Sequence, residues 1–268
     1  MKNIIVISSL VLGLLVVGIA WSGTSAGSVQ AQAGSVQAQA SSVQADVDGA
    51  PLPPHVAYRV FVHYPQQGNH GKSPVVRPSC TATASDPGTF GEAGWHLAKP
   101  ETYHLNEASV PTGVGGTANV YTALNDAWSA WHAADSGIAI SQDSPSLLTR
   151  AKYDGVNLVA WGNVPNSAIA VTYTWYNTVS DAQLESDTIF NSRLAWSYTP
   201  YTTDCGGTAG KYDVGDIATH EFGHWVGLDD LYKSADKDLT MYGYGFTAEL
   251  KKDTLSAGDV SGAVAITP

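Results

Sequence analysis

The spacing of hydrophobic and polar residues after position 55 predicts a mixed fold of strands and helices. Apolar and polar residues alternate from Val56 to Tyr64, which is the pattern of a strand with one buried face. From Thr117, the expected cap, to about Ala134, apolar side chains recur at helical spacing, and Gly137 is expected to end that helix. Further strands are expected at residues 138–141, 157–161, 168–176 and 187–191.

Two shorter helices are predicted from capping patterns near the C-terminus. Asp213 followed by Asp216 resembles the start of a capping box, and Ser256 followed by Asp259 predicts a closing helix through Val264. No element can be assigned in residues 65–116, which are rich in Gly, Pro, Ser and Thr. The fold class expected is therefore α+β.

The first 26 residues have the pattern of an export signal. Lys2 precedes an apolar stretch from Ile4 to Ala20, and small residues follow up to a plausible cleavage site after Ala26. The alternative is an uncleaved anchor, because this stretch is close to the shortest that spans a bilayer. Both interpretations place the rest of the chain outside the cytoplasm.

Residues 27–54 are predicted to be a linker or a short pro-segment. A seven-residue unit, Gly-Ser-Val-Gln-Ala-Gln-Ala, occurs twice and is followed by a drifted copy. One valine per unit cannot form a coiled-coil seam, which needs two apolar positions in each heptad. Prolines at positions 51, 53 and 54 mark the end of this segment. A single catalytic domain is expected at residues 55–268.

Composition and cysteine content narrow the possible functions. The formal net charge is −11, with 13 Lys+Arg against 24 Asp+Glu, which argues against a nucleic-acid-binding protein. Hydrophobic residues make up 44% of the chain, enough for a sizeable core. In an exported protein the two cysteines, Cys80 and Cys205, are expected to form a disulfide.

The run from His220 to Asp230 carries the candidate chemistry. His220 and His224 are one helical turn apart, so both imidazoles can reach one metal ion, and Glu221 can act as general base on a metal-bound water. Gly227 can adopt a positive φ and end the helix, which allows Asp230 to return as a third ligand. Three protein ligands and an open position are typical of catalytic zinc.

These residues resemble the signature of the metzincin clan of zinc endopeptidases, H-E-x-x-H-x-x-G-x-x-H followed by a methionine turn. His220, Glu221, His224 and Gly227 match position for position, and Asp230 replaces the final His, as in the snapalysins. The competing candidate for the third ligand is Asp229, whose spacing fits the signature less well.

The resemblance covers roughly residues 56–265 and implies a matrixin-like zincin. Its fold would have a twisted mixed sheet, a long N-terminal helix, the zinc-binding helix and a short C-terminal helix. Met241 would be the methionine turn beneath the ligands, and Tyr244 would touch zinc or the oxyanion. In matrixin propeptides a cysteine ligates the zinc, and Cys80 is a candidate for that role as an alternative to the disulfide.

The resemblance also implies structural calcium, for which a group of loop acids offers ligands. These are Asp143, Asp154, Asp181, Glu185 and Asp187. The remaining histidines lack paired spacing, so surface or satisfied polar roles are expected for His55, His63, His70, His96, His104 and His132.

The sequence therefore predicts a secreted zinc endopeptidase in which Glu221 is the general base. Its partner would be a protein or peptide substrate, bound extended along an exposed sheet edge beside the zinc helix. The alternative is a non-catalytic, zinc-containing extracellular binding protein on a protease-like fold. A third hypothesis is a metal-dependent hydrolase acting on a non-peptide amide.

Overall fold

The computed structural model describes residues 45–66, 86–200 and 206–268. The expected signal segment, most of the expected linker, His70, Cys80 and Cys205 lie outside the described residues, so the disulfide stays a prediction. None of the helices in the described part is long and apolar enough to cross a membrane.

The described residues form strands, three α-helices and short 3₁₀ turns. The strands are β1 (Val56–Pro65), β2 (Glu101–Leu105), β3 (Ile140–Gln142), β4 (Leu158–Gly162), β5 (Ala170–Asn177), β6 (Gln183–Asn191), β7 (Trp196–Ser197), β8 (Tyr212–Asp213) and β9 (Tyr244–Gly245). The helices are α1 (Thr117–Ala134), α2 (Val214–Val226) and α3 (Ala257–Ile266). The 3₁₀ turns are η1 (Glu107–Ser109), η2 (Thr112–Val114), η3 (Ser234–Asp236) and η4 (Lys251–Asp253).

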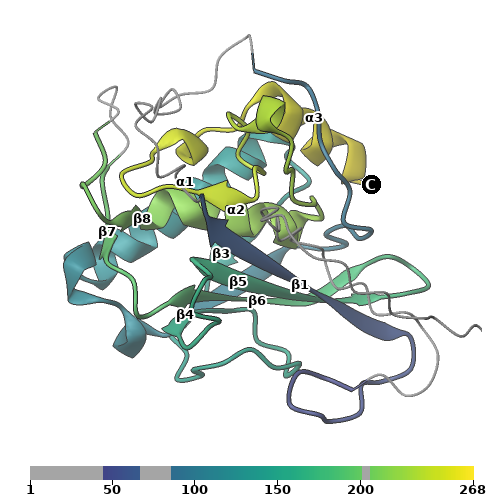
Figure 1. Cartoon of the computed structure of the whole chain (residues 1–268). Helices are drawn as coiled ribbons and strands as arrows, with labels where there is room; N and C mark the ends of the chain where they lie inside the picture. The colour runs from purple at the N-terminus through teal and green to yellow at the C-terminus, as the bar shows by residue number, and fades with distance from the viewer. Residues whose placement is uncertain (1–44, 67–85, 201–205) are drawn as a thin grey trace, which may run out of the picture. The chain divides into compact units, whose positions relative to one another are not determined.

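Seven of these strands form one mixed sheet in the order β3-β2-β4-β6-β5-β1-β9. The neighbours among β3, β2, β4 and β6 pair in parallel, whereas β5 is antiparallel to both β6 and β1. β1 is parallel to β9 where it ends. The expected α+β class with a mixed sheet is therefore confirmed (Figure 1).

The edge of β5 is not free. β1 pairs with it over eight positions, from Val56 opposite Asn177 to His63 opposite Ala170. An extended peptide cannot add to β5 while β1 is in place, because the backbone groups on that side are already bonded. β5 therefore offers no free edge on the side of β1, and the expectation that a substrate binds extended along an exposed sheet edge beside the zinc helix stays a prediction.

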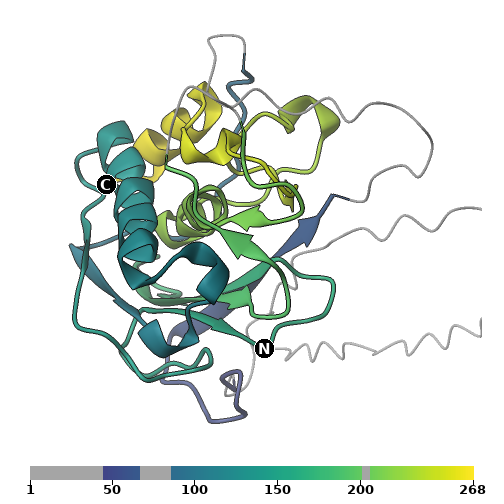
Figure 2. The ribbon, with the colours of Figure 1, turned by 90° about the vertical axis from the view of Figure 1, so that its left-hand side faces the viewer.

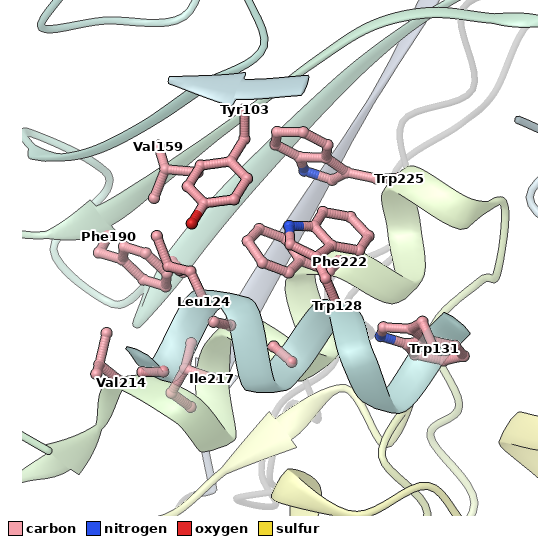
Figure 3. Packing of buried hydrophobic residues seen from close by; sticks show 14 of the residues in the cluster. Tyr103, Leu124, Trp128, Trp131, Val159, Phe190, Val214, Ile217, Phe222 and Trp225 are labelled. Atoms are coloured by element: carbon pink, nitrogen blue, oxygen red, sulfur yellow. The ribbon is translucent and has the colours of Figure 1, made fainter. Parts of the chain in front are cut away.

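The helices lie on one face of the sheet, and the main hydrophobic core lies between the helices and the sheet (Figures 1 and 2). Trp128 of α1 stacks on Phe222 of α2, with ring centroids 3.9 Å apart and planes within 8° (Figure 3). Trp131 of α1 donates its indole N–H to the carbonyl oxygen of Thr219, 2.9 Å away. These contacts fix α2 against α1 and so hold the candidate metal-binding helix in position.

The opposite face of the sheet packs against irregular segments that include part of the expected linker. Asp46 accepts hydrogen bonds from the indole of Trp175 at 2.9 Å and from the backbone of Tyr153 at 3.0 Å. Leu52 belongs to the same buried cluster as Trp175. The described fold thus includes residues that precede His55.

The helix caps in the structure agree in part with those expected from the sequence. Asp213 caps α2 through a 2.9 Å bond from the amide of Gly215, and Ser256 with Asp259 forms the expected capping box of α3. α1 spans the expected residues, but its N-cap is Gly116 rather than Thr117. Its C-cap is Asp135, and Gly137 lies in the turn beyond. Asp216 does not complete a capping box, because its carboxylate accepts from the amide of Lys252 at 2.7 Å.

Candidate metal centre

Helix α2 carries His220, Glu221 and His224 into the interior, where each side chain is at most 1% exposed. The helix ends at Gly227, whose φ of 121° disfavours any residue with a side chain. A Cβ at this position would also overlap the carbonyl oxygen of Trp95. Glycine therefore permits the turn that returns the chain to Asp230 beside the helix.

His220, His224 and Asp230 converge on one point. Their candidate ligand atoms all lie within 4.8 Å of one another. Asp230 Oδ1 is 3.3 Å from His220 Nε2 and 3.6 Å from His224 Nε2. Ligand atoms bound to a tetrahedral zinc ion at about 2.0–2.1 Å lie roughly 3.3 Å apart. These separations match the size of such a site.

Hydrogen bonds on the far side of each imidazole leave a lone pair facing the centre. The Nδ1 of His220 lies 2.7 Å from the carbonyl oxygen of Thr240, and the Nδ1 of His224 lies 2.9 Å from that of Leu228. A carbonyl oxygen can only accept, so each Nδ1 carries the proton and each Nε2 has a free lone pair.

Three atoms with free lone pairs thus face one another: His220 Nε2, His224 Nε2 and Asp230 Oδ1. Among the described residues, neither His220 Nε2 nor Asp230 Oδ1 has a hydrogen-bond partner, although both atoms are buried. Buried acceptors without a donor are costly, and a cation between them would satisfy all three. The group His220, His224 and Asp230 can therefore hold a metal ion.

Burial keeps both imidazoles in the form that ligates metals. It lowers the pKa of His224 to about 4, and the attraction of Asp230 only partly offsets it. Burial also lowers the pKa of His220 well below its usual value, and the charge of Lys252 acts in the same direction. Both rings are therefore neutral at neutral pH, and no proton competes with the metal there.

Glu221 lies beside this group and is held by two side chains from the sheet. Thr172 Oγ1 donates to Oε2 at 2.7 Å, and His63 Nδ1 lies 3.1 Å from Oε1. Burial raises the pKa of Glu221 to about 8, and the negative charge of Asp230 adds to this effect. A bound cation would act in the opposite direction by favouring the carboxylate.

His63 is one of the residues of this site that sequence reasoning missed. It is buried on β1, where a satisfied polar role was expected but not a place beside His220 and Glu221. Its ring packs against that of His220 at a centroid distance of 3.9 Å with the planes tilted by 34°. Phe61, two residues earlier, stacks on His224 at 3.9 Å. The strand alternation placed Phe61 and His63 on one face, but it did not indicate what that face contacts.

The competing third ligand, Asp229, points elsewhere. Its Oδ2 lies 3.0 Å from the guanidinium of Arg59, and its Oδ1 accepts from the amide of Asp230 at 2.9 Å. Asp229 therefore anchors the turn to β1, while Asp230 faces the two imidazoles. Spacing favoured Asp230, and the structure places it accordingly.

Met241, the residue expected to form the methionine turn, packs against α2. A Cβ at Gly223 would overlap its sulfur, so the two residues are in close contact on the helix surface. The amides of Thr240 and Met241 donate to the carboxylate of Asp259 at 3.0 and 3.1 Å. Asp259 thus fixes the segment whose Thr240 carbonyl orients His220.

A tyrosine does contact a candidate ligand, but it is Tyr232. Its hydroxyl donates to Asp230 Oδ2 at 2.9 Å. The ring of Tyr244 packs against those of Tyr232 and Tyr242, both at 5.5 Å between centroids. Tyr244 therefore lies one ring away from the candidate ligands in this structure.

Across the described ranges, two groups bring three potential ligands together: His220 with His224 and Asp230, and His63 with His220 and Glu221. The five acids considered for calcium belong to neither group. Glu185 and Asp187 instead accept hydrogen bonds from backbone amides, including those of Gly155 and Leu158. Among the described residues no three of these five acids therefore form such a group, and structural calcium stays a prediction.

No protein-family model matches this chain, and no curated protein sequence matches it either. A functional assignment must therefore rest on the geometry of the site.

Proposed function

We propose that the chain is an exported, zinc-dependent endopeptidase of the metzincin type, matrixin-like in fold. The observation that carries this proposal is the convergence of His220, His224 and Asp230, with Glu221 on the same helix as the two histidines. Two imidazoles and one carboxylate form a set of nitrogen and oxygen donors typical of catalytic zinc. Magnesium and calcium prefer oxygen ligands throughout.

The chain supplies the groups that peptide hydrolysis needs. A bound zinc ion would supply a Lewis acid and lower the pKa of a coordinated water. Glu221 would accept the proton of the water that attacks the peptide carbonyl and deliver it to the departing amine. Asp230 brings more negative charge than an imidazole would, which favours activity at neutral to mildly alkaline pH. A rate profile with its maximum at about pH 5 would contradict this expectation.

One observation favours a second candidate function. The candidate ligands are closed off from solvent, with side-chain exposures of 0% for His220, 1% for His224 and 5% for Asp230. Burial that keeps a substrate away from the ligands would suit a non-catalytic, zinc-containing extracellular binding protein. Tyr232, whose hydroxyl donates to Asp230, is 38% exposed. For an enzyme, we infer that substrate enters on this side and displaces Tyr232.

The proposed substrate is a protein or peptide outside the cell. Export follows from the signal-like residues 1–26, and the protein would stay at the membrane only if that segment is not cleaved. The acidic net charge of −11 argues against nucleic acid as a partner.

Casein digestion by the purified protein tests the proposal. Hydrolysis is expected to stop with a chelator, to return with added zinc, and to be lost in Glu221→Gln, which is expected to keep its zinc. A zinc-loaded wild type that cleaves neither casein nor a panel of peptides would favour the binding protein. Hydrolysis of non-peptide amides alone would indicate a different hydrolase.

A further inference from the structure

A fully buried lysine lies behind the candidate base. Lys252, from η4, is 0% exposed, and its Nζ is 3.1 Å from His63 Nε2. The other ring nitrogen of His63, Nδ1, is 3.1 Å from Glu221 Oε1. Three distant segments of the chain are thus joined in series: η4, β1 and α2.

We propose that His63 and Lys252 are positioning residues that hold Glu221 in the orientation needed to serve a metal-bound water. This inference rests on the proposed function. It adds two residues that the motif at positions 220–230 does not contain.

The charge of Lys252 sets the direction of these hydrogen bonds. In its ammonium form Lys252 can only donate, so His63 Nε2 then accepts and Nδ1 carries the ring proton. That proton is donated to the carboxylate of Glu221. Lys252 also donates to the carbonyl oxygen of Tyr242, which fixes its position. The lysine thereby selects the tautomer of His63 that can bind Glu221.

A second series of hydrogen bonds holds the other carboxylate oxygen. The indole of Trp225 donates to Thr188 Oγ1 at 2.9 Å, so the Thr188 hydroxyl can donate to Thr172 Oγ1, 2.7 Å away. The Thr172 hydroxyl donates to Glu221 Oε2 at 2.7 Å. Donors on both oxygens prevent rotation of the carboxylate, and each oxygen keeps a lone pair for a further proton.

The position of Lys252 is costly to maintain, which favours a role beyond packing. Burial lowers its pKa, and the nearby carboxyl groups of Glu249 and Asp216 offset part of that effect. Its amide is bound to Asp216 Oδ1 at 2.7 Å, which ties η4 to α2. If the side chain at position 252 only filled space, an apolar side chain would leave the protein more stable than a buried lysine does.

Two variants of His63 separate positioning from packing. In His63→Gln the side-chain amide can still donate to Glu221 and accept from Lys252, whereas His63→Leu fills similar space without either bond. We expect His63→Leu to lower kcat about 10- to 100-fold, as losses of supporting hydrogen bonds at metal sites do. KM and zinc content should stay unchanged, and His63→Gln should recover most of kcat. Lys252→Met should behave like His63→Leu.

His132→Leu is the matched control, because this histidine binds the carbonyl oxygen of Ile138, away from the site. It is expected to leave kcat unchanged. A folded, zinc-loaded His63→Leu variant with wild-type or higher kcat would overturn the proposal. A kcat above that of the wild type would mean that His63, and with it β1, only obstructs access to the site. Failure of His63→Gln to restore kcat would also overturn it.

A readout without turnover separates this inference from the proposed function. ¹⁵N NMR of the histidine rings in the zinc-loaded protein should show His63 protonated at Nδ1 and not at Nε2, and Lys252→Met should alter that pattern. A proton on Nε2 in the wild type would overturn the hydrogen-bond series. If the wild type hydrolyses no peptide while the tautomer is as expected, the proposed function fails and the series stands.

Discussion

The ring of Phe61 lies parallel to the imidazole of His224, with centroids 3.9 Å apart and planes within 13°. His63, on the same face of β1, covers His220 at the same centroid distance of 3.9 Å, with the ring planes tilted by 34°. One strand therefore shields both candidate histidine ligands from solvent. This contact explains their burial and hence the lowered pKa of each ring.

The hydroxyl of Tyr232 is expected to stabilise the metal site through Asp230. Burial and the adjacent Asp230 raise the pKa of Tyr232, so the hydroxyl keeps its proton and donates it. Tyr232→Phe removes this bond and should weaken zinc binding about 10- to 100-fold. A competition titration with a chromophoric chelator measures the change. Tyr244→Phe is the control and should bind zinc as the wild type does; the reverse ranking would contradict this geometry.

Stability of the metal-free protein should depend on pH through Glu221. Its pKa is about 8 in the folded protein against 4.5 for the free side chain, so between these values the folded state keeps a proton that the unfolded state releases. Stability from this group is therefore complete below about pH 4.5 and is lost as pH rises towards 8.

Denaturant unfolding of the metal-free wild type and of Glu221→Gln, from pH 5 to 8, isolates this contribution. The variant lacks the carboxyl group, and every other titrating group is shared. The free energy of unfolding of the wild type should fall relative to the variant by on the order of a few kcal/mol. Parallel curves would show that Glu221 ionises normally.

Gly223 should tolerate no side chain. A Cβ there would overlap the sulfur of Met241 and lie 2.8 Å from Trp131 Cζ2. Gly223→Ala is expected to lower the free energy of unfolding by about 1–3 kcal/mol, even though alanine favours helix. Gly88→Ala is the control, because a Cβ at Gly88 meets nothing within 4 Å. Equal stabilities of the two variants would show that Met241 does not pack against α2.

The elements with strong periodicity were predicted well. β1 and α1 match the expected ranges because each has one continuous buried face. The short strand β2 was missed, because five residues within a stretch rich in Gly and Pro carry too little pattern to be recognised. β6 begins at Gln183, before the expected start at residue 187. Its first residues were missed because buried polar residues such as Glu185 do not give the apolar pattern of a strand.

The candidate site was predictable only where it is local in sequence. His220, Glu221, His224 and Asp230 lie within one short run. Helix geometry places the first three, and the turn at Gly227 returns Asp230 to them. His63 and Lys252 are 189 positions apart and meet only through the tertiary fold. Neither residue has a spacing that points to its partner, so sequence alone could not identify the support behind Glu221.

The zinc content of purified wild type, Asp230→Ala and Asp229→Ala, measured by elemental analysis after equilibration with zinc and gel filtration, tests the central claim most directly. Asp230 faces the two imidazoles, whereas Asp229 binds Arg59. We expect one zinc ion per chain in the wild type and in Asp229→Ala, and far less in Asp230→Ala. A wild type without zinc, or an Asp230→Ala variant that keeps all of it, would contradict the account.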